Sequence, residues 1–241
     1  MLKTLPMIGA LLALLALAGC GGTAAGTAQA TASSAASAAT QSTATAAPAA
    51  TQGTATAAAA ATQTAPAGAT TYVIDGASSK ASYSVSELLL NQNINRTAVG
   101  TTSAVSGNLV VSGGQIQPST VTVNLTGLTS DQARRDQYVQ KNTLDTATYP
   151  NAVFAITGAT GPALADGQTV TLQLSGNMTI HGTTKPETFA TQASMQGGTL
   201  HLVGTSSFTF EDFGMQPPTI LHLLTVHDPL QINVDLTAKQ G

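Results

Sequence analysis

The sequence predicts an all-β domain, built from about eight or nine antiparallel strands and preceded by a segment that does not fold. From residue 71 onward apolar and polar side chains alternate with a period of two, as in Val170, Leu172 and Leu174, which is typical of half-buried strands. Most connections are too short for parallel pairing, which needs a crossover of a dozen residues or more. Before residue 71 the only charged residue is Lys3 and no aromatic residue occurs.

The first twenty residues, MLKTLPMIGALLALLALAGC, have a basic residue followed by an apolar run at 8–18. This run is too short to span a bilayer stably and ends in small residues, so residues 1–19 are predicted to be a signal peptide. Leu17-Ala18-Gly19-Cys20 resembles the bacterial lipobox, and the resemblance implies that Cys20 carries the lipid and becomes the mature N-terminus. The alternative is an ordinary signal peptide that leaves Cys20 as an incidental thiol.

Residues 20–70 are rich in Ala, Thr, Ser, Gln and Gly without a period. They offer little apolar area to offset the backbone entropy lost on folding, so we expect a disordered linker with a reach of roughly 40 Å. With a lipid anchor at Cys20 the protein would be exported and attached to the cell envelope, on its periplasmic or extracellular face. Residues 71–241 then form one domain.

The strands are predicted in order along this domain. They cover residues 71–74, 81–87, 104–111, 120–126, 152–157, 169–182, 187–195, 199–210 and 230–236. Glycine-rich turns separate most of them, including Gly113-Gly114 and Gly197-Gly198. Residues 130–140 interrupt the pattern and predict a short surface helix with Ser130 as its N-cap.

A sheet of this length must either fold over as a sandwich or close into a barrel. Closure removes edge strands, which this domain has few charges to protect. At about eight strands a barrel is either filled by its own side chains or able to hold one slender ligand. Tryptophan is absent and five phenylalanines serve the whole domain, which modestly favours an unfilled interior.

Other functions find little support in the sequence. Without Lys3 the domain has seven basic and eleven acidic residues, so a nucleic-acid partner is not expected. The four histidines, at 181, 201, 222 and 227, lack zinc-ligand spacing and a cysteine companion. No Gly-x-Ser-x-Gly elbow is present, and we expect neither a metal, nor a cofactor, nor catalysis.

Four stretches resemble the YceI family. RRDQYVQKNTLDTATYPNAVF carries its Arg135-Asp136 pair, Tyr149-Pro150 and Phe154. LSGNMTIHGTTKPETF at 174–189 resembles a family hairpin, FTFEDFGM at 208–215 resembles its Asp-Phe-Gly segment, and TYVIDGASSKASYSV resembles its first hairpin. The segments at 88–90 and 215–226 depart from the family pattern by being apolar.

The resemblance implies a lipocalin-like antiparallel β-barrel with an apolar cavity that binds a polyisoprenoid or another amphipathic lipid, such as a quinone or its precursor, without catalysis. It also implies a homodimer. The alternative is a packed structural or interaction module displayed on the anchored stalk. The side chains expected to line the cavity are Leu109, Val123, Leu125, Phe154, Leu172, Leu174, Phe189, Phe208, Phe210, Phe213, Ile232 and Val234.

Individual polar residues have structural interpretations. Arg135 and Asp136 are expected to make capping and loop-anchoring hydrogen bonds. Asp212 is expected to form a turn, and Lys185-Pro186 to form the turn of a hairpin. The phenylalanines either line the cavity or plug the ends of the barrel.

Overall fold

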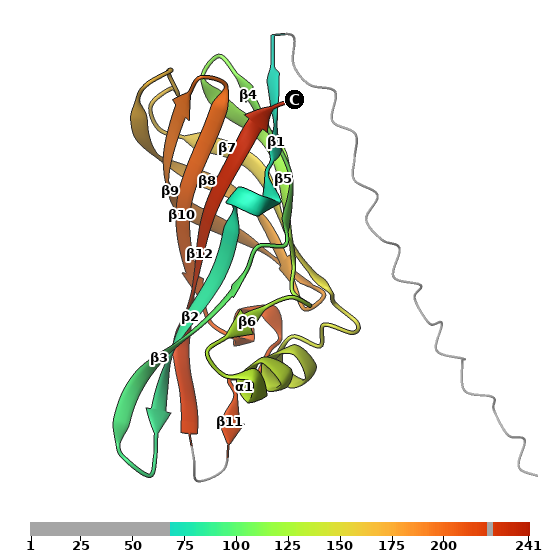
Figure 1. Ribbon diagram of the computed structural model, residues 1–241, viewed down its shortest axis with the longest axis vertical. Helices are drawn as coiled ribbons and strands as arrows, with labels where there is room; N and C mark the ends of the chain where they lie inside the picture. Colours follow the sequence, from blue (N-terminus) through green and yellow to red (C-terminus); the bar gives the residue numbers. More distant parts are fainter. Residues whose placement is uncertain (1–67, 221–223) are drawn as a thin grey trace, which may run out of the picture. The chain divides into compact units, whose positions relative to one another are not determined.

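The computed structural model describes residues 68–220 and 224–241, and eight of its strands close into an antiparallel barrel (Figure 1). Each strand pairs with the next in the ring, and β1 pairs with β12 to close it. In ring order these strands are β1 (Thr70–Ile74), β4 (Val105–Ser112), β5 (Gln115–Asn124), β7 (Asn151–Thr160), β8 (Thr169–Ile180), β9 (Thr183–Gln196), β10 (Thr199–Phe208) and β12 (Leu224–Gln240). The closed barrel is therefore confirmed over the sandwich.

Strand β12 is 17 residues long and extends beyond the ring. Along the edge that faces away from β10 it pairs first with β2 (Lys80–Leu89) and then with β1. Its last residues pair with β1, whereas its first twelve pair with β2 through a bulge between His227 and Gln231. β2 pairs in turn with β3 (Ile94–Thr102), and the two-residue strands β6 (Thr129–Ser130) and β11 (Thr219–Ile220) complete this extension. Figure 1 shows the β2–β3 hairpin projecting past the barrel at the end opposite the start of β1.

At the β1 end the barrel is filled by its own side chains. Ala193, Leu200 and Ala238 have no exposed surface, and the Tyr72 hydroxyl donates a hydrogen bond to Met195 Sδ at 3.2 Å. The 161–168 loop covers this end, where the Leu164 N–H donates to the Gly114 carbonyl at 2.7 Å. We call this region the packed end.

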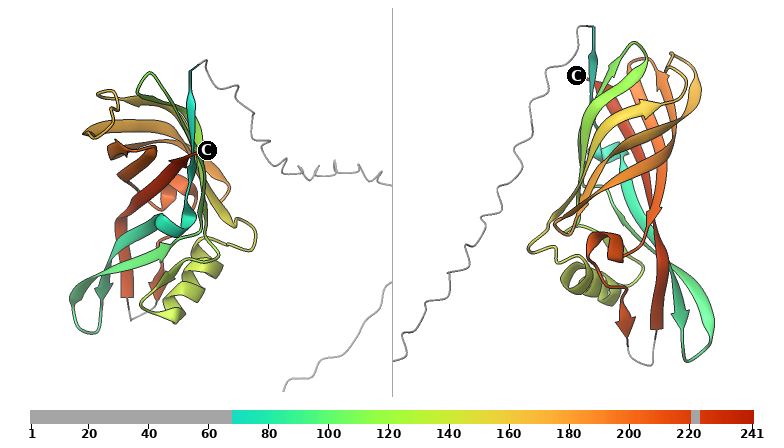
Figure 2. Two further views of the ribbon diagram at one scale, coloured as in Figure 1. Left: turned by 45° about the horizontal axis from the view of Figure 1, so that its top comes forward. Right: turned by 180° about the vertical axis from the view of Figure 1, so that it is seen from behind.

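The other end of the barrel is covered by helix α1 (Ala133–Tyr138) and the π-helical turn η2 (Val139–Thr143). The short 3-10 helix η3 (Glu211–Phe213) lies beside them, as the rear view in Figure 2 shows. A further 3-10 turn, η1 (Gly76–Ser78), joins β1 to β2. We call the region around α1 the open end, for the reason given in the next subsection.

Strand β3 is the element that the sequence analysis missed. Its residues 94–97 are exposed, and its inward positions carry the small residues Ala98 and Gly100 beside Thr102. Without bulky apolar residues at every second position, the period of two is hard to see. The inward side of this strand is small because Tyr83 of β2 lies across it: a Cβ on Gly100 would come within 2.2 Å of the Tyr83 ring.

Two local predictions were wrong. Lys185 and Pro186 do not form the turn of the β8–β9 hairpin; they lie in β9, opposite Met178 and Asn177. β10 pairs with β9 only from Ala190 onward, so Pro186 lies on an open strand edge, where proline is tolerated. Ser130 is not the N-cap of α1, because that position is Gln132 and no side chain caps it.

The signal peptide, the lipidated Cys20 and nearly all of the linker lie outside the described residues and stay predictions. The described residues, 68–220 and 224–241, belong to one compact unit. Within the described part of the chain, no helix combines the length and apolar character needed to cross a membrane.

Candidate functional site: a cavity at the open end

A cavity of about 490 Å³ extends from the middle of the barrel to helix α1, within the usual size range of ligand sites. Its inner wall is formed by apolar side chains that point inward from the ring of strands and from β2. These include Ala81, Val85, Leu109, Val121, Val123, Phe154, Ile156, Leu174, Met178, Ile180, Phe189, Leu202, Leu230, Ile232, Val234 and Leu236. A site with this lining offers burial to hydrocarbon and few partners to a polar ligand.

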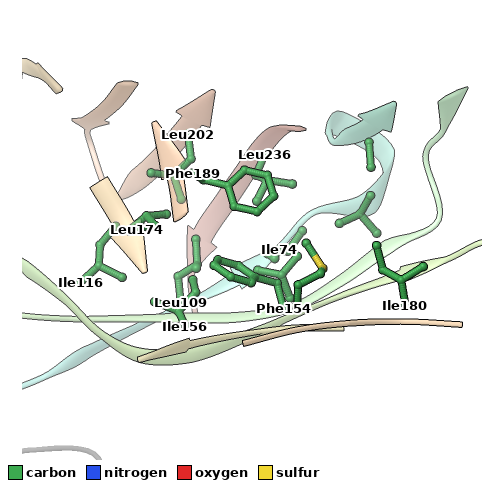
Figure 3. Close-up of a cluster of buried hydrophobic side chains, with 14 of the residues drawn as sticks. Ile74, Leu109, Ile116, Phe154, Ile156, Leu174, Ile180, Phe189, Leu202 and Leu236 are labelled. Carbon is green, nitrogen blue, oxygen red and sulfur yellow. The ribbon is translucent and has the colours of Figure 1, made fainter. Parts of the chain in front are cut away.

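Two phenylalanines contact each other inside the barrel. The Phe154 and Phe189 rings lie with their centroids 4.9 Å apart, and Figure 3 shows them facing one another within the buried cluster. Phe154 packs tightly on β8 because the inward residue there is Gly176; a Cβ at this position would lie 2.8 Å from the ring. Both rings are buried by the barrel and also contribute to the cavity wall.

The cavity reaches the protein surface beside α1 and η2. Arg134, Gln137, Lys141 and Asn142 contribute to its lining, and all four are exposed. The inner part of the cavity is thus aliphatic and aromatic, whereas its mouth is polar and carries positive charge. This gradient suits an amphipathic molecule with its hydrocarbon part inside and its polar part at the mouth.

An ion pair joins the helix to the barrel at this mouth. Arg135 Nε and Nη2 donate to the two Glu87 carboxylate oxygens at 3.1 and 3.0 Å, an in-plane bidentate arrangement. The Arg135 side chain is 16% exposed and that of Glu87 7%. Burial by itself would lower the pKa of Arg135, but hydrogen bonds to Glu87 and Asp131 and their charges outweigh it, so the pKa is raised and the guanidinium stays charged.

The neighbouring acid holds the loop before the helix. Asp136 Oδ1 accepts hydrogen bonds from the Ser130 backbone N–H at 2.9 Å and from the Ser130 hydroxyl at 2.6 Å. Arg135 Nη1 also donates to the Ser130 hydroxyl, at 3.3 Å, and pairs with Asp131. The loop-anchoring role expected for Arg135 and Asp136 is confirmed, but the expected capping is not, because no side chain caps α1. The salt bridge to Glu87 adds a contact that the sequence analysis did not foresee.

Tyr83 is a partly buried phenol in this wall. Burial raises the pKa of its phenol to about 12, with smaller effects from Arg135 and the nearby acids. The raised pKa means that the surroundings disfavour a charged phenolate. Tyr83 lies in the cavity wall together with Glu87. The negative charge of Glu87 is neutralised by its ion pair with Arg135.

The structure places nine of the twelve predicted lining residues in the cavity wall: Leu109, Val123, Leu125, Phe154, Leu174, Phe189, Phe210, Ile232 and Val234. The other three lie in the core outside it. Leu172 belongs to the packed part of β8, and Phe208 packs against the fully buried Phe213 with ring centroids 4.5 Å apart. Whether the nine contact a ligand stays a prediction.

The sequence analysis overlooked the polar part of the site. Glu87 and Tyr83 occupy inward positions of the predicted strand 81–87, alternating with outward serines, so the period of two could have placed them inside. The lining by α1 and η2 had no such signal, because the way a short helix covers a barrel mouth depends on contacts between distant residues.

The remaining polar groups have local roles. Asp212 Oδ2 accepts from the Thr209 N–H and hydroxyl at 2.8 and 2.7 Å, which confirms the predicted turn, and these hydrogen bonds lower the pKa of Asp212. His201 pairs with Asp235 at 2.7 Å on the outside of the barrel. His222 lies outside the described residues, and among those described no three His, Cys, Asp or Glu side chains gather in a group that could hold a metal.

The YceI-like domain family matches residues 72–238, the whole of the barrel. The chain belongs to that family. Among curated proteins it is 29% identical to a UPF0312 protein of Shewanella sp. (strain W3-18-1) over 163 residues, covering 62% of this chain and 79% of the relative. It is also 29% identical to a UPF0312 protein of Pseudomonas putida (strain W619), over 49% of this chain and 64% of the relative.

Solved structures share the fold of this YceI-like barrel. BcnA of Burkholderia cenocepacia superposes with a TM-score of 0.54 at 19% identity, over 69% of this chain and 99% of BcnA. A polyisoprenoid binding domain from Saccharophagus degradans, implicated in plant cell wall breakdown, gives a TM-score of 0.52 at 13% identity, over 70% of this chain and 98% of that domain.

Proposed function

We propose that this protein binds an amphipathic lipid of the polyisoprenoid type in its barrel and sequesters or carries it without chemical change. The observation that carries the proposal is the cavity of about 490 Å³ with an apolar interior and a polar mouth. Membership of the YceI-like family and the fold shared with a polyisoprenoid binding domain support it. A barrel packed solid throughout, the structural-module alternative, does not fit this cavity.

Burial of hydrocarbon supplies the affinity. Each Å² of apolar surface removed from water contributes about 25 cal/mol, and the inner wall needs no charged partner from the ligand. The ligand's polar end, a quinone ring or another headgroup, then lies at the mouth beside Arg134 and Lys141. Because the inner wall is predominantly apolar, specificity for the hydrocarbon depends mainly on its length and width.

Extraction of native protein tests this proposal. The full chain is produced in a lipid-replete bacterial host, purified without detergent, denatured and extracted with organic solvent. Mass spectrometry is expected to detect a long-chain lipid in near-stoichiometric amount. A Val123→Phe variant, which projects a ring into the cavity, is the matched control and should lose most of that lipid. Protein that is folded but yields no lipid from either form would contradict the proposal.

We further propose that the domain is exported and anchored to the cell envelope through a lipid on Cys20, with residues 20–70 as its linker. The lipobox-like sequence and the short apolar run before it support this. Growth with an alkyne-bearing fatty acid should label the wild-type chain and leave a Cys20→Ser variant unlabelled. Equal labelling of the two would contradict the anchor and leave the lipid-binding proposal intact.

A further inference from the structure

The apolar wall of the cavity continues onto exposed surface at the open end. Leu224 of β12 lines the cavity, and the register places it opposite Leu89 of β2, which lies opposite Ile94 of β3. Side chains directly opposite on neighbouring strands share one face of a sheet. The three residues therefore form an apolar row from the cavity to the projecting hairpin, and Ile94 at its outer end is 44% exposed.

Leu90 follows Leu89 directly, at the hairpin turn, and is 46% exposed. Together Leu89, Leu90, Ile94 and Leu224 form what we call the apolar apron. A protein with so few charged residues gains solubility by covering such groups. The apron instead lies on the most projecting part of the molecule, at the end where the cavity reaches the surface (Figures 1 and 2).

Exposed basic residues flank the apron. No acidic residue occurs between residues 88 and 130 or between residues 213 and 227. Arg96 on β3 and Arg134 and Lys141 at the mouth are exposed cations at this end, while the acids Glu87 and Asp131 both pair with Arg135. An apolar edge flanked by basic residues is the pattern of proteins that dock on anionic membrane surfaces.

The described chain begins at the end of the barrel opposite the mouth. Strand β1, to which the first 69 residues connect, begins at Thr70 beside Val111, at the packed end. Figure 1 shows that start and the C-terminus together, at the end opposite the β2–β3 hairpin. The linker predicted for residues 20–70 is therefore joined to the barrel at the end away from the mouth.

We propose that the open end docks on a lipid bilayer, with Leu90 and Ile94 inserted at the level of the headgroups and the basic residues on the anionic surface. This goes beyond binding of a cargo lipid: it gives the cargo a route between bilayer and cavity along the apolar row, without crossing water. It makes the apron a membrane surface and not an interface with a second copy of the chain.

The absence of tryptophan allows a direct test in the full chain. Single tryptophans are introduced as Leu90→Trp and, as a matched control, Val203→Trp, since Val203 is 45% exposed on the outer face of β10. Vesicles of phosphatidylglycerol and phosphatidylethanolamine carry brominated acyl chains. We expect a blue shift and quenching about fivefold stronger for Leu90→Trp than for Val203→Trp. Comparing two positions in the same chain removes any contribution from the N-terminal segment.

The outcomes that overturn the proposal are distinct. Equal quenching at both positions, or none at Leu90→Trp, shows that the apron does not enter the bilayer. A blue shift that needs no vesicles and grows with protein concentration shows that a second copy covers the apron. Vesicles of neutral phosphatidylcholine should bind about tenfold more weakly than the anionic ones. The fluorescence results do not depend on whether lipid is found by extraction. The membrane-docking proposal and the lipid-binding proposal can therefore fail independently.

Discussion

The two ends of the barrel are built from the same strands but differ in what fills them. At the packed end β8 contributes Leu172 and β10 contributes Leu200, and these side chains meet Ala193 and Ala238 with almost no exposed surface. A few residues along the same strands, Leu174 and Leu202 face the cavity. One continuous alternation of apolar residues along a strand therefore builds both a packed core and a cavity wall.

The elements that cover the two ends are held in place by different kinds of interaction. The packed end is covered by a loop through backbone hydrogen bonds and Leu164, whereas the open end is covered by a helix that an ion pair and polar side chains attach to β2. Hydrophobic packing is strong and does not depend on direction, while a bidentate ion pair holds a definite geometry. We therefore expect the packed end to contribute more to the stability of the fold. At the open end the ion pair fixes the position of the covering helix.

Truncation of leucines should show the largest difference between the two ends. Leu200→Ala at the packed end is expected to lower the free energy of unfolding by about 4 kcal/mol, because it leaves a void among close-packed neighbours. Leu174→Ala should cost about 2 kcal/mol, since part of its surface already faces the cavity and has fewer contacts to lose. Urea unfolding followed by circular dichroism measures both, and equal losses would contradict the assignment of the two ends.

The ion pair is expected to have the next largest effect. A double-mutant cycle with Glu87→Gln and Arg135→Gln should give a coupling free energy of about 2–3 kcal/mol, because either change alone leaves a partly buried group without its partner. The pair of Lys239 and Asp75 at the packed end, 2.7 Å apart, is the control. It is solvent-exposed, and its cycle should give much weaker coupling.

Adding volume should separate stability from binding. Val111→Phe at the packed end is expected to cost about 2 kcal/mol of unfolding free energy, because the core there has no room for the ring. Val123→Phe fills existing space, so unfolding should change by less than about 1 kcal/mol while bound lipid falls at least tenfold. An equal loss of unfolding free energy in both variants would show that the space beside Val123 is too small for an added ring, and so for a ligand.

The sequence was sufficient for the ring but not for the whole site. Alternation along 169–182 and 120–126 predicted strands β8 and β5, and the shared strand face predicted that Phe189 lines the interior. It could not separate Leu172 from Leu174, because both obey the same period and differ only in their position along the barrel relative to the cavity. Phe208 and Phe213 were assigned to the cavity, but they plug the barrel beside η3, as the alternative interpretation allowed.

The polar mouth was harder to predict because it depends on long-range contacts. Glu87 and Arg135 are 48 residues apart, and neither segment contains a sequence pattern that predicts contact with the other. The missed strand β3 has the same cause: its inward residues are small because Tyr83 occupies the space above Gly100. Such complementary pairs of large and small residues become visible only when the register of the strands is known.

Alkaline titration provides the smallest expected effect and tests how dry the open end is. Burial raises the pKa of Tyr83 from 10.0 to about 12, so the folded protein holds this proton more tightly than the unfolded chain does. The resulting stabilisation is fully present below pH 10 and is lost as the pH rises to 12, a decrease of about 2 kcal/mol. Urea unfolding at pH 9 and pH 11.5 measures it, with absorbance at 295 nm to follow the phenol.

Tyr83→Phe is the matched control, because it keeps the ring over Gly100 and removes the ionisable group. The variant should lose less stability than the wild type over the same pH interval. A phenol of Tyr83 that ionises near pH 10 would mean that water fills the cavity to the depth of β2. In that case the apolar wall would not be poorly hydrated before the ligand arrives, and the affinity proposed for lipid would have to include displacement of that water.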